Sequence, residues 1–239
     1  MNLNKQIKEF LIGTLLGDAH IGRTGLNKAF ISFEQSSKKR EYLNYLLNIT
    51  KEGKLPLMEE SVREYLRDDP RYKTTNRSLY FRTQSIEELK PMADLFLDRE
   101  GKKIIPQNIA DHLTARSLAF WIMDDGQQVK RGGVTLCTDS YSTGRLRISI
   151  LREALKKNFN LETSIHNKKG ANDAIYERIY IKEDELENIK PSLKSHMHES
   201  MFNKINENQS ETQNAIKQDS SDIENDGTDI LDIFDIGGS

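Results

Sequence analysis

Two apolar stretches of nine residues dominate the hydrophobic pattern of the chain, and each carries an acid at its eighth position. They are LIGTLLGDA (Leu11–Ala19) and LAFWIMDDG (Leu118–Gly126), and both predict a buried helix. The acid at the eighth position is Asp18 in the first stretch and Asp125 in the second. A carboxylate there is electrostatically unfavourable, because the last carbonyls of a helix already carry partial negative charge. Both acids therefore need an explanation beyond helix formation.

The pattern around the two stretches predicts the same order of elements twice: helix, strand, helix, two strands and helix. The first half is predicted to hold a helix over Gln6–Ala19, a strand over Ala29–Gln35, a helix over Lys38–Ile49, strands near Pro56–Val62 and Ser78–Gln84, and a helix over Ile86–Leu97. The second half is predicted to hold a helix over Leu113–Asp125, a strand over Gly133–Thr138, a helix over Arg147–Phe159, strands near Glu162–Asn167 and Ala174–Lys182, and a helix over Asp184–His196. The repeat predicts two matched subdomains, 1–100 and 113–206, with a linker at 101–112 and a tail at 207–239.

Two glycines on the first apolar helix predict how the halves meet. Gly13 and Gly17 lie one turn apart, and glycine inside a helix costs about 0.5–1 kcal/mol relative to alanine. Their presence indicates a close contact with a second helix. If the two apolar helices pair about a pseudo-twofold axis, Asp18 and Asp125 end side by side.

Two adjacent carboxylates raise each other's pKa unless a cation lies between them. The exposed carbonyls of the two helix ends add negative charge at the same place. Such a site favours a hard divalent ion with oxygen ligands, Mg²⁺ or Mn²⁺. Beside a basic surface, this metal site would suit phosphodiester hydrolysis.

The net charge of −2 hides an uneven distribution, because residues 207–239 hold nine acids and one base. The remaining residues therefore carry a net charge of +6, which favours a nucleic-acid partner. The tail is expected to be disordered. Its end, DILDIFDIGGS, could dock on a replication or transcription protein, and an inert solubilising end is the alternative.

The single cysteine, Cys137, and the lack of a long apolar run predict an intracellular protein without a membrane segment. Its expected location is the cytoplasm or an organelle matrix, wherever the host DNA resides.

Alternating polar residues on two predicted strands indicate a surface for duplex DNA. In IYERIYIKE and RSLYFRTQ, tyrosine and arginine share one face by period-two alternation, as expected of a sheet that enters a major groove. The predicted loop GDAHIGRTGLNK adds two further bases. The candidate DNA-binding residues are Arg23, Lys28, Tyr80, Arg82, Tyr176, Arg178, Tyr180 and Lys182.

The paired nonamers resemble the motifs of the LAGLIDADG homing endonucleases in their monomeric, two-motif form. The resemblance covers about residues 6–206, and FEQSSKKREYL and SLAFWIMDDGQ are similar to the branch of the yeast mitochondrial intron enzymes. The consensus has a small residue where this chain has Phe120, which predicts an asymmetric contact against the glycines of the first helix.

The resemblance implies an α+β fold of two pseudo-symmetric αββαββα subdomains, whose antiparallel sheets form a saddle over DNA. It also implies a set of active-site residues. The metal would be held by Asp18 with the Gly17 carbonyl and by Asp125 with the Asp124 carbonyl, and lysines beside the two centres would be Lys103 and Lys204.

The sequence therefore predicts a monomeric, site-specific, double-strand DNA endonuclease that uses Mg²⁺ or Mn²⁺. The alternative is a protein of the same fold that binds nucleic acid without cutting, either an intron RNA maturase or a transcription regulator. Retention of Asp18 and Asp125 favours the enzyme, because a pure binder has no need of adjacent acids at helix ends. A maturase can keep both acids, so a dual role with intron RNA as a partner stays open.

Overall fold

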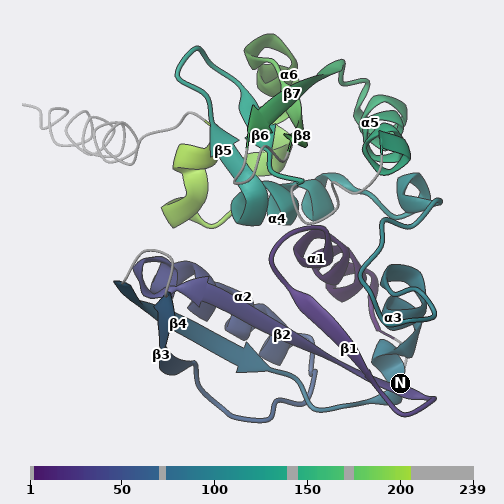
Figure 1. Cartoon of the computed structure of the whole chain (residues 1–239), viewed down its shortest axis with the longest axis vertical. Coiled ribbons are helices and arrows are strands. Elements are labelled where there is room, and N and C mark those ends of the chain that lie inside the picture. Colours follow the sequence, from purple (N-terminus) through teal and green to yellow (C-terminus); the bar gives the residue numbers. More distant parts are fainter. Residues whose placement is uncertain (1–2, 70–73, 139–144, 170–174, 206–239) are drawn as a thin grey trace, which may run out of the picture.

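The chain folds into two halves, each built on one four-stranded antiparallel sheet (Figure 1). The computed structural model describes residues 3–69, 74–138, 145–169 and 175–205. The first half contains α1 (Lys5–Leu16), β1 (His20–Thr24), β2 (Lys28–Ser36), α2 (Arg40–Glu52), β3 (Arg63–Asp69), β4 (Thr74–Arg82) and α3 (Lys90–Phe96). The second half contains α4 (Ala115–Asp125), β5 (Gly126–Gln128), β6 (Val134–Leu136), α5 (Arg145–Phe159), β7 (Thr163–Lys169), β8 (Ile175–Ile181) and α6 (Glu183–Lys194).

The strand order is β1-β2-β4-β3 in one sheet and β5-β6-β8-β7 in the other. The identical order confirms the predicted repeat and the α+β class. The subdomain boundaries remain a prediction, and the tail from 207 on lies outside the described residues. In the described part of the chain, no helix has the length and apolar character needed to cross a membrane.

Two details of the predicted strands are wrong. The hydrophobic pattern placed only one strand between each apolar helix and the next helix, with a loop over GDAHIGRTGLNK, whereas the structure has two, β1 and β2 in one half and β5 and β6 in the other, as the αββαββα order implied by the resemblance requires. The strand expected near Pro56–Val62 instead begins at Arg63. Leu55 and Leu57 are buried, but Leu57 makes only an isolated bridge to Thr83.

Helices α1 and α4 lie side by side between the two sheets (Figure 1). The side chain of Asn4 accepts a hydrogen bond from the Ile7 N–H at the start of α1, and Thr114 forms a capping box with Ser117 at the start of α4. These caps satisfy backbone donors that would otherwise lack partners. The apolar faces of both helices are buried in one core shared by the two halves.

The glycine stripe is the contact surface of α1, as the sequence predicted. A Cβ on Gly13 would lie 2.3 Å from the Ser117 carbonyl oxygen and 2.6 Å from the Phe120 Cβ. A Cβ on Gly17 would lie 2.5 Å from the Asp124 Cβ. The helices therefore approach at a separation that only glycine permits here, and the contact is asymmetric because large residues of α4 face glycines of α1.

Candidate active site at the ends of the paired helices

Asp18 follows the end of α1, and Asp125 is the last residue of α4, so the helix pairing brings both acids to one edge of the interface. Asp18 is exposed, whereas Asp125 is half-buried. Burial and the negative charge of Asp18 raise the pKa of Asp125 to about 7, and the nearby ammonium groups of Lys103 and Lys204 partly offset this rise. The two carboxylates therefore lie close enough to repel each other electrostatically, as expected for a cation site.

Lys103 and Lys204 occupy matching positions at the two helix ends. Lys103 Nζ donates to the carbonyl oxygens of Gly17 and Ala19, both at 2.9 Å. Lys204 Nζ donates to the Gly126 carbonyl oxygen at 2.5 Å. Each ammonium compensates the negative end of its helix dipole. The structure thus brings together all four side chains that the sequence resemblance placed at the two centres.

The pKa values of both lysines are lowered from that of an ordinary lysine. Burial lowers the pKa of Lys103 to about 8, although Asp125, Asp124 and Asp18 oppose the shift. Burial, with repulsion from Lys39, also lowers the pKa of Lys204. Perturbed values of this kind cluster at functional sites, where groups are held away from water beside charges.

Asp124 contributes a buried side chain that the sequence interpretation did not foresee. Tyr42 Oη donates to Asp124 Oδ1 at 2.8 Å, and the Asp18 N–H donates to Asp124 Oδ2 at 3.3 Å. Gln35 Nε2 donates to Asp124 Oδ1 at 3.2 Å and to Asp18 Oδ2 at 2.9 Å. Burial and the charge of Asp18 nonetheless raise the pKa of Asp124 well above its ordinary value.

Gln35, Tyr42 and Lys39 are site residues that the sequence interpretation missed. Gln35 follows Ile31 and Phe33 on the inward face of β2, so a polar residue in an apolar alternation was the available signal. Lys39 lies near enough to the acids to lower the pKa values of Asp124 and Asp125. The sequence offered no comparable signal for Lys39, because it lies between two other bases, Lys38 and Arg40.

The donor set suits a divalent cation with oxygen ligands. In the described ranges no three His, Cys, Asp or Glu side chains cluster as a complete metal site. The available donors are the carboxylates of Asp18 and Asp125 with carbonyl oxygens at the helix ends, all hard oxygen ligands. Mg²⁺ commonly uses one or two carboxylates and completes its shell with waters and substrate phosphate. The residues present therefore fit Mg²⁺ or Mn²⁺ better than a metal ion whose ligands all come from protein side chains.

A polar groove of about 780 Å³ opens beside Asp18. Its basic residues, Lys38, Lys39 and Arg77, come from the 3₁₀ turn Ser37–Lys39 that precedes α2 and from β4. The lining residues are Asp18, Glu34, Gln35, Ser36, Ser37, Lys38, Lys39, Thr75, Asn76, Arg77 and Ser78. Three bases against two acids leave a net positive charge in the groove, which suits a phosphate backbone.

On the first sheet, Arg82 is held by an aromatic ring. Its guanidinium carbon lies 3.5 Å from the ring centre of Phe30, and the Tyr80 ring packs edge-on against Tyr65 at 5.6 Å. Lys28 is exposed at the start of β2. These three predicted residues lie on one sheet, where Lys28 is exposed and Tyr80 and Arg82 are half-buried.

On the second sheet, the predicted residues differ in exposure. Arg178 is only 7% exposed and donates to Gln127 Oε1 at 3.1 Å. Tyr180 stacks on His166 with ring centres 4.5 Å apart, and its hydroxyl donates to the Gly132 carbonyl oxygen at 3.1 Å. Tyr176 is half-buried, and Lys182 is exposed just before α6. Alternation identified the shared face but not the side chains that cover Arg178.

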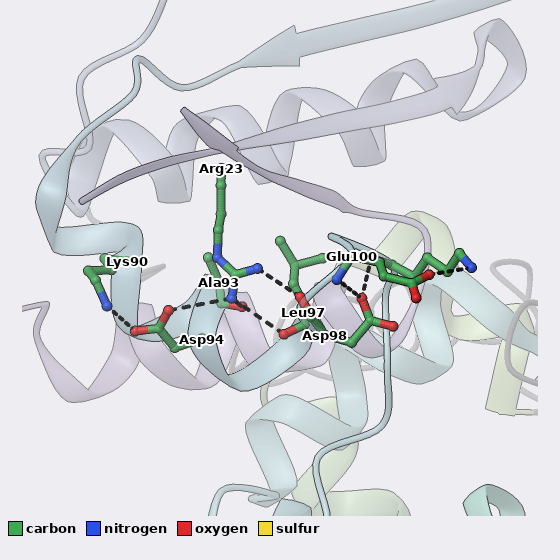
Figure 2. Close-up of polar contacts among 8 residues, drawn as sticks. Arg23, Lys90, Ala93, Asp94, Leu97, Asp98 and Glu100 are labelled. Atoms are coloured by element: carbon green, nitrogen blue, oxygen red, sulfur yellow. Dashed lines mark hydrogen bonds and ion pairs between the residues drawn. The ribbon is translucent and has the colours of Figure 1, made fainter. Parts of the chain in front are cut away.

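Arg23 has a structural role that the sequence did not indicate. Figure 2 shows its guanidinium turned toward the end of α3, where it donates to the carbonyl oxygens of Ala93, Leu97 and Asp98 at 3.1, 3.4 and 2.9 Å. It also pairs with the Asp94 carboxylate at 3.5 Å. The expected DNA contact is therefore not supported, because these donors hold the β1–β2 hairpin to the C-terminal end of α3.

Comparison with known proteins identifies related sequences over most of the chain. Residues 8–189 match the profile of the LAGLIDADG DNA endonuclease family. DNA endonuclease I-ChuI of Chlamydomonas applanata is 30% identical over 199 residues, which cover 77% of this chain and 86% of that protein. Cytochrome b mRNA maturase bI2 of Debaryomyces hansenii is 26% identical over 204 residues, covering 85% of this chain and 74% of that protein.

The fold also matches a solved structure. The homing endonuclease I-WcaI bound to its DNA recognition sequence superposes with a TM-score of 0.74 at 24% identity, covering 86% of this chain and 88% of that chain. This likeness supports the two-sheet architecture described above.

Proposed function

The chain belongs to the LAGLIDADG DNA endonuclease family, and we propose that it cuts both strands of a long, specific DNA site by metal-dependent phosphodiester hydrolysis. The observation that carries this proposal is the meeting of Asp18 and Asp125 at the ends of paired helices, with a half-buried lysine at each end. A helix pair that served only packing would gain nothing from this concentration of like charge.

The proposed metal is Mg²⁺ or Mn²⁺, held by Asp18 and Asp125 with the carbonyls of Gly17 and Asp124. When bound, such an ion polarises the scissile phosphate and lowers the pKa of a bound water. Lys103, with a pKa of about 8, can give up or take a proton at Nζ near neutral pH.

DNA would lie across both sheets, which would form a saddle. On the first sheet the proposed contacts are Lys28, Tyr80 and Arg82. On the second sheet they are Tyr176, Arg178, Tyr180 and Lys182. An arginine whose plane is fixed by an aromatic ring, as Arg82 is by Phe30, is well suited to bidentate contact with guanine.

The test is cleavage of DNA that spans the uninterrupted form of the gene in which this reading frame lies. Wild type should cut with Mg²⁺ and stop with EDTA, and Asp18→Asn and Asp125→Asn should each abolish cutting. Asp184→Asn, an exposed acid at the start of α6, is the matched control and should cut normally. Specific cutting by either active-site variant would contradict the proposed mechanism.

A second function, binding of intron RNA, is favoured by one observation. The similarity to the cytochrome b mRNA maturase spans 85% of this chain. Specific, salt-resistant binding to the surrounding intron RNA, with splicing rescued in its presence, would establish this role. Unchanged splicing would argue against it.

We propose that the protein acts as an intracellular monomer in the compartment of its target DNA, because α1 and α4 of one chain complete the site. A single species of monomer mass in light scattering would support this. The proposed partner of the acidic tail is a replication or transcription protein. Unchanged pull-down partners after deletion of residues 221–239 would refute that partner.

A further inference from the structure

The two halves of the active site are supported differently. In the first half, three hydrogen-bond donors converge on the Asp124 carboxylate, which is 6% exposed: the Tyr42 hydroxyl, the Gln35 amide and the Asp18 N–H. Tyr42 is fully buried, and Gln35 is 6% exposed. A buried carboxylate with several partners has little freedom to move, so each partner is held in place as well.

Gln35 transmits this support to Asp18. Its one Nε2 group donates both to Asp124 Oδ1 and to Asp18 Oδ2, at 3.2 and 2.9 Å. The chain Tyr42–Asp124–Gln35–Asp18 therefore runs from the core of α2 to the exposed acid. We call these four residues the Tyr42 network.

The Asp124 side chain can reach into the first half only because residue 17 is a glycine. A Cβ on Gly17 would lie 2.6 Å from Asp124 Oδ2, so only glycine leaves room for the carboxylate. Gly17 and Asp124 occupy the same position of the two nonamers. Because Gly17 has no side chain, no residue at this position of α1 reaches into the second half. Only the first half therefore receives hydrogen-bonding support across the helix interface.

The matching position in the second half is used otherwise. His20 and Gln127 each lie two residues after an active-site acid, and they pair with Ser32 and Thr135 on the next strand. Gln35 and Thr138 each follow these partners by three residues, so they occupy matching positions in the two halves. Thr138 is buried, and its hydroxyl donates to a carbonyl oxygen of its own sheet, that of Glu177, at 2.5 Å. Within the described residues, the Asp125 carboxylate receives no hydrogen bond of the kind that Gln35 gives Asp18.

We propose that Tyr42 is a positioning residue for the Asp18 half of the active site, acting through Asp124 and Gln35, so that it governs the cutting of one DNA strand more than the other. This inference rests on the proposed endonuclease function. It adds that the two cleavages differ in what they require. Cleavage of the DNA strand at the Asp18 side depends on the Tyr42 network, and cleavage of the strand at the Asp125 side does not.

The experiment measures the two strand cuts separately. Target duplex carrying a different 5′ fluorophore on each strand is cut under single-turnover conditions by excess full-length enzyme with Mg²⁺, and the products are separated on denaturing gels. Tyr42→Phe removes only the hydroxyl and should shift the ratio of the two rate constants by roughly 10- to 150-fold, the range for a lost hydrogen bond to a charged group. DNA affinity in EDTA should not change.

Tyr45→Phe is the matched control, because Tyr45 lies one turn further along α2 and donates to a backbone carbonyl oxygen, that of His196, at 3.4 Å. It should leave the ratio as in wild type. Gln35→Met is a second probe that removes the amide donors at similar volume. It should shift the ratio in the same direction, and the double variant should add nothing to the larger single effect.

Equal slowing of both strands by Tyr42→Phe, or multiplied effects in the double variant, would overturn the positioning role. If wild type cuts and Asp18→Asn does not, while Tyr42→Phe keeps the wild-type ratio, only this role fails. If no form cuts either strand, the proposed function fails with it.

Discussion

Lys103 Nζ lies 2.9 Å from the Gly17 carbonyl oxygen, so the linker between the halves ends the first apolar helix with a positive charge. The same ammonium donates to the Ala19 carbonyl oxygen. Its position places a cation at the negative end of a helix dipole and beside two acids. Lys204 makes the matching contact with Gly126 at the end of α4.

Lys103→Met should lower the cleavage rate by roughly 100-fold or more, the range for loss of a positioned proton donor or acceptor. It should also change the pH dependence of stability. The folded pKa of about 8 lies below the ordinary 10.5, so between these values the unfolded chain binds more protons and stability rises with pH. The variant should lack this rise in chemical denaturation with EDTA.

Lys102→Met is the control for that measurement, because Lys102 is the exposed neighbour and pairs only with Glu100 at the surface in the contacts described. It should keep both the wild-type rate and the rise in stability between pH 8 and 10.5. A rise retained by Lys103→Met would show that this ammonium is not the titrating group.

Asp125→Asn should stabilise the protein while abolishing cutting. The folded pKa of about 7 lies above the ordinary 3.8, so the folded state binds more protons in this window and wild-type stability falls as the pH rises through it. The neutral amide does not incur this loss. We expect the variant to be more stable by roughly 1–3 kcal/mol at pH 8 in EDTA, and by much less at pH 4. Equal stability of the two proteins at pH 8 would contradict the charge conflict.

Arg23→Met should lower stability without weakening DNA binding. Its guanidinium holds the β1–β2 hairpin to three carbonyl oxygens at the end of α3 (Figure 2), and loss of such bonds costs roughly 1–3 kcal/mol. Lys28→Met, in the same hairpin but exposed, should show the opposite result: unchanged stability and weaker, less salt-dependent DNA binding. Thermal unfolding and fluorescence anisotropy on target DNA distinguish the two.

Gly13→Ala should test the helix contact. Its Cβ would meet the Ser117 carbonyl oxygen at 2.3 Å, and backbone at that distance has to move. Overpacking of this kind costs about 1–3 kcal/mol. Asn44→Ala, on the exposed face of α2, is the control and should change stability little. A wild-type melting temperature for Gly13→Ala would show that the helices can separate freely.

The sequence predicted the elements whose signal is local. The two nonamers identified α1 and α4, the glycines predicted their contact, and Phe120 predicted its asymmetry. The hydrophobic pattern alone missed strands β1 and β5, which only the resemblance implied, because five and three residues are too few for a periodic signal. Their existence depends on pairing with β2 and β6, which is a tertiary property.

The charged residues of the candidate site were predicted from the sequence, but the residues that hold them in place by hydrogen bonds were not. Asp18, Asp125 and the two lysines follow from the motifs and the resemblance, whereas the partners of the Asp124 side chain come from β2 and α2. Those contacts require knowing how closely α4 approaches the first half, which sequence spacing does not encode. Arg23 and Arg178 show the same limit, since their hydrogen-bond partners, Ala93 and Gln127, are distant along the chain.

The unequal pair at the seventh nonamer position makes the halves non-interchangeable. A homodimer of two first halves would set Gly17 against Gly17 and leave a void where the carboxylate now sits. A homodimer of two second halves would force two Asp124 side chains into a space that accepts one. Attempts to recombine this chain with other two-motif proteins should therefore keep each nonamer with the partner helix it now faces, treating the pair as one indivisible module.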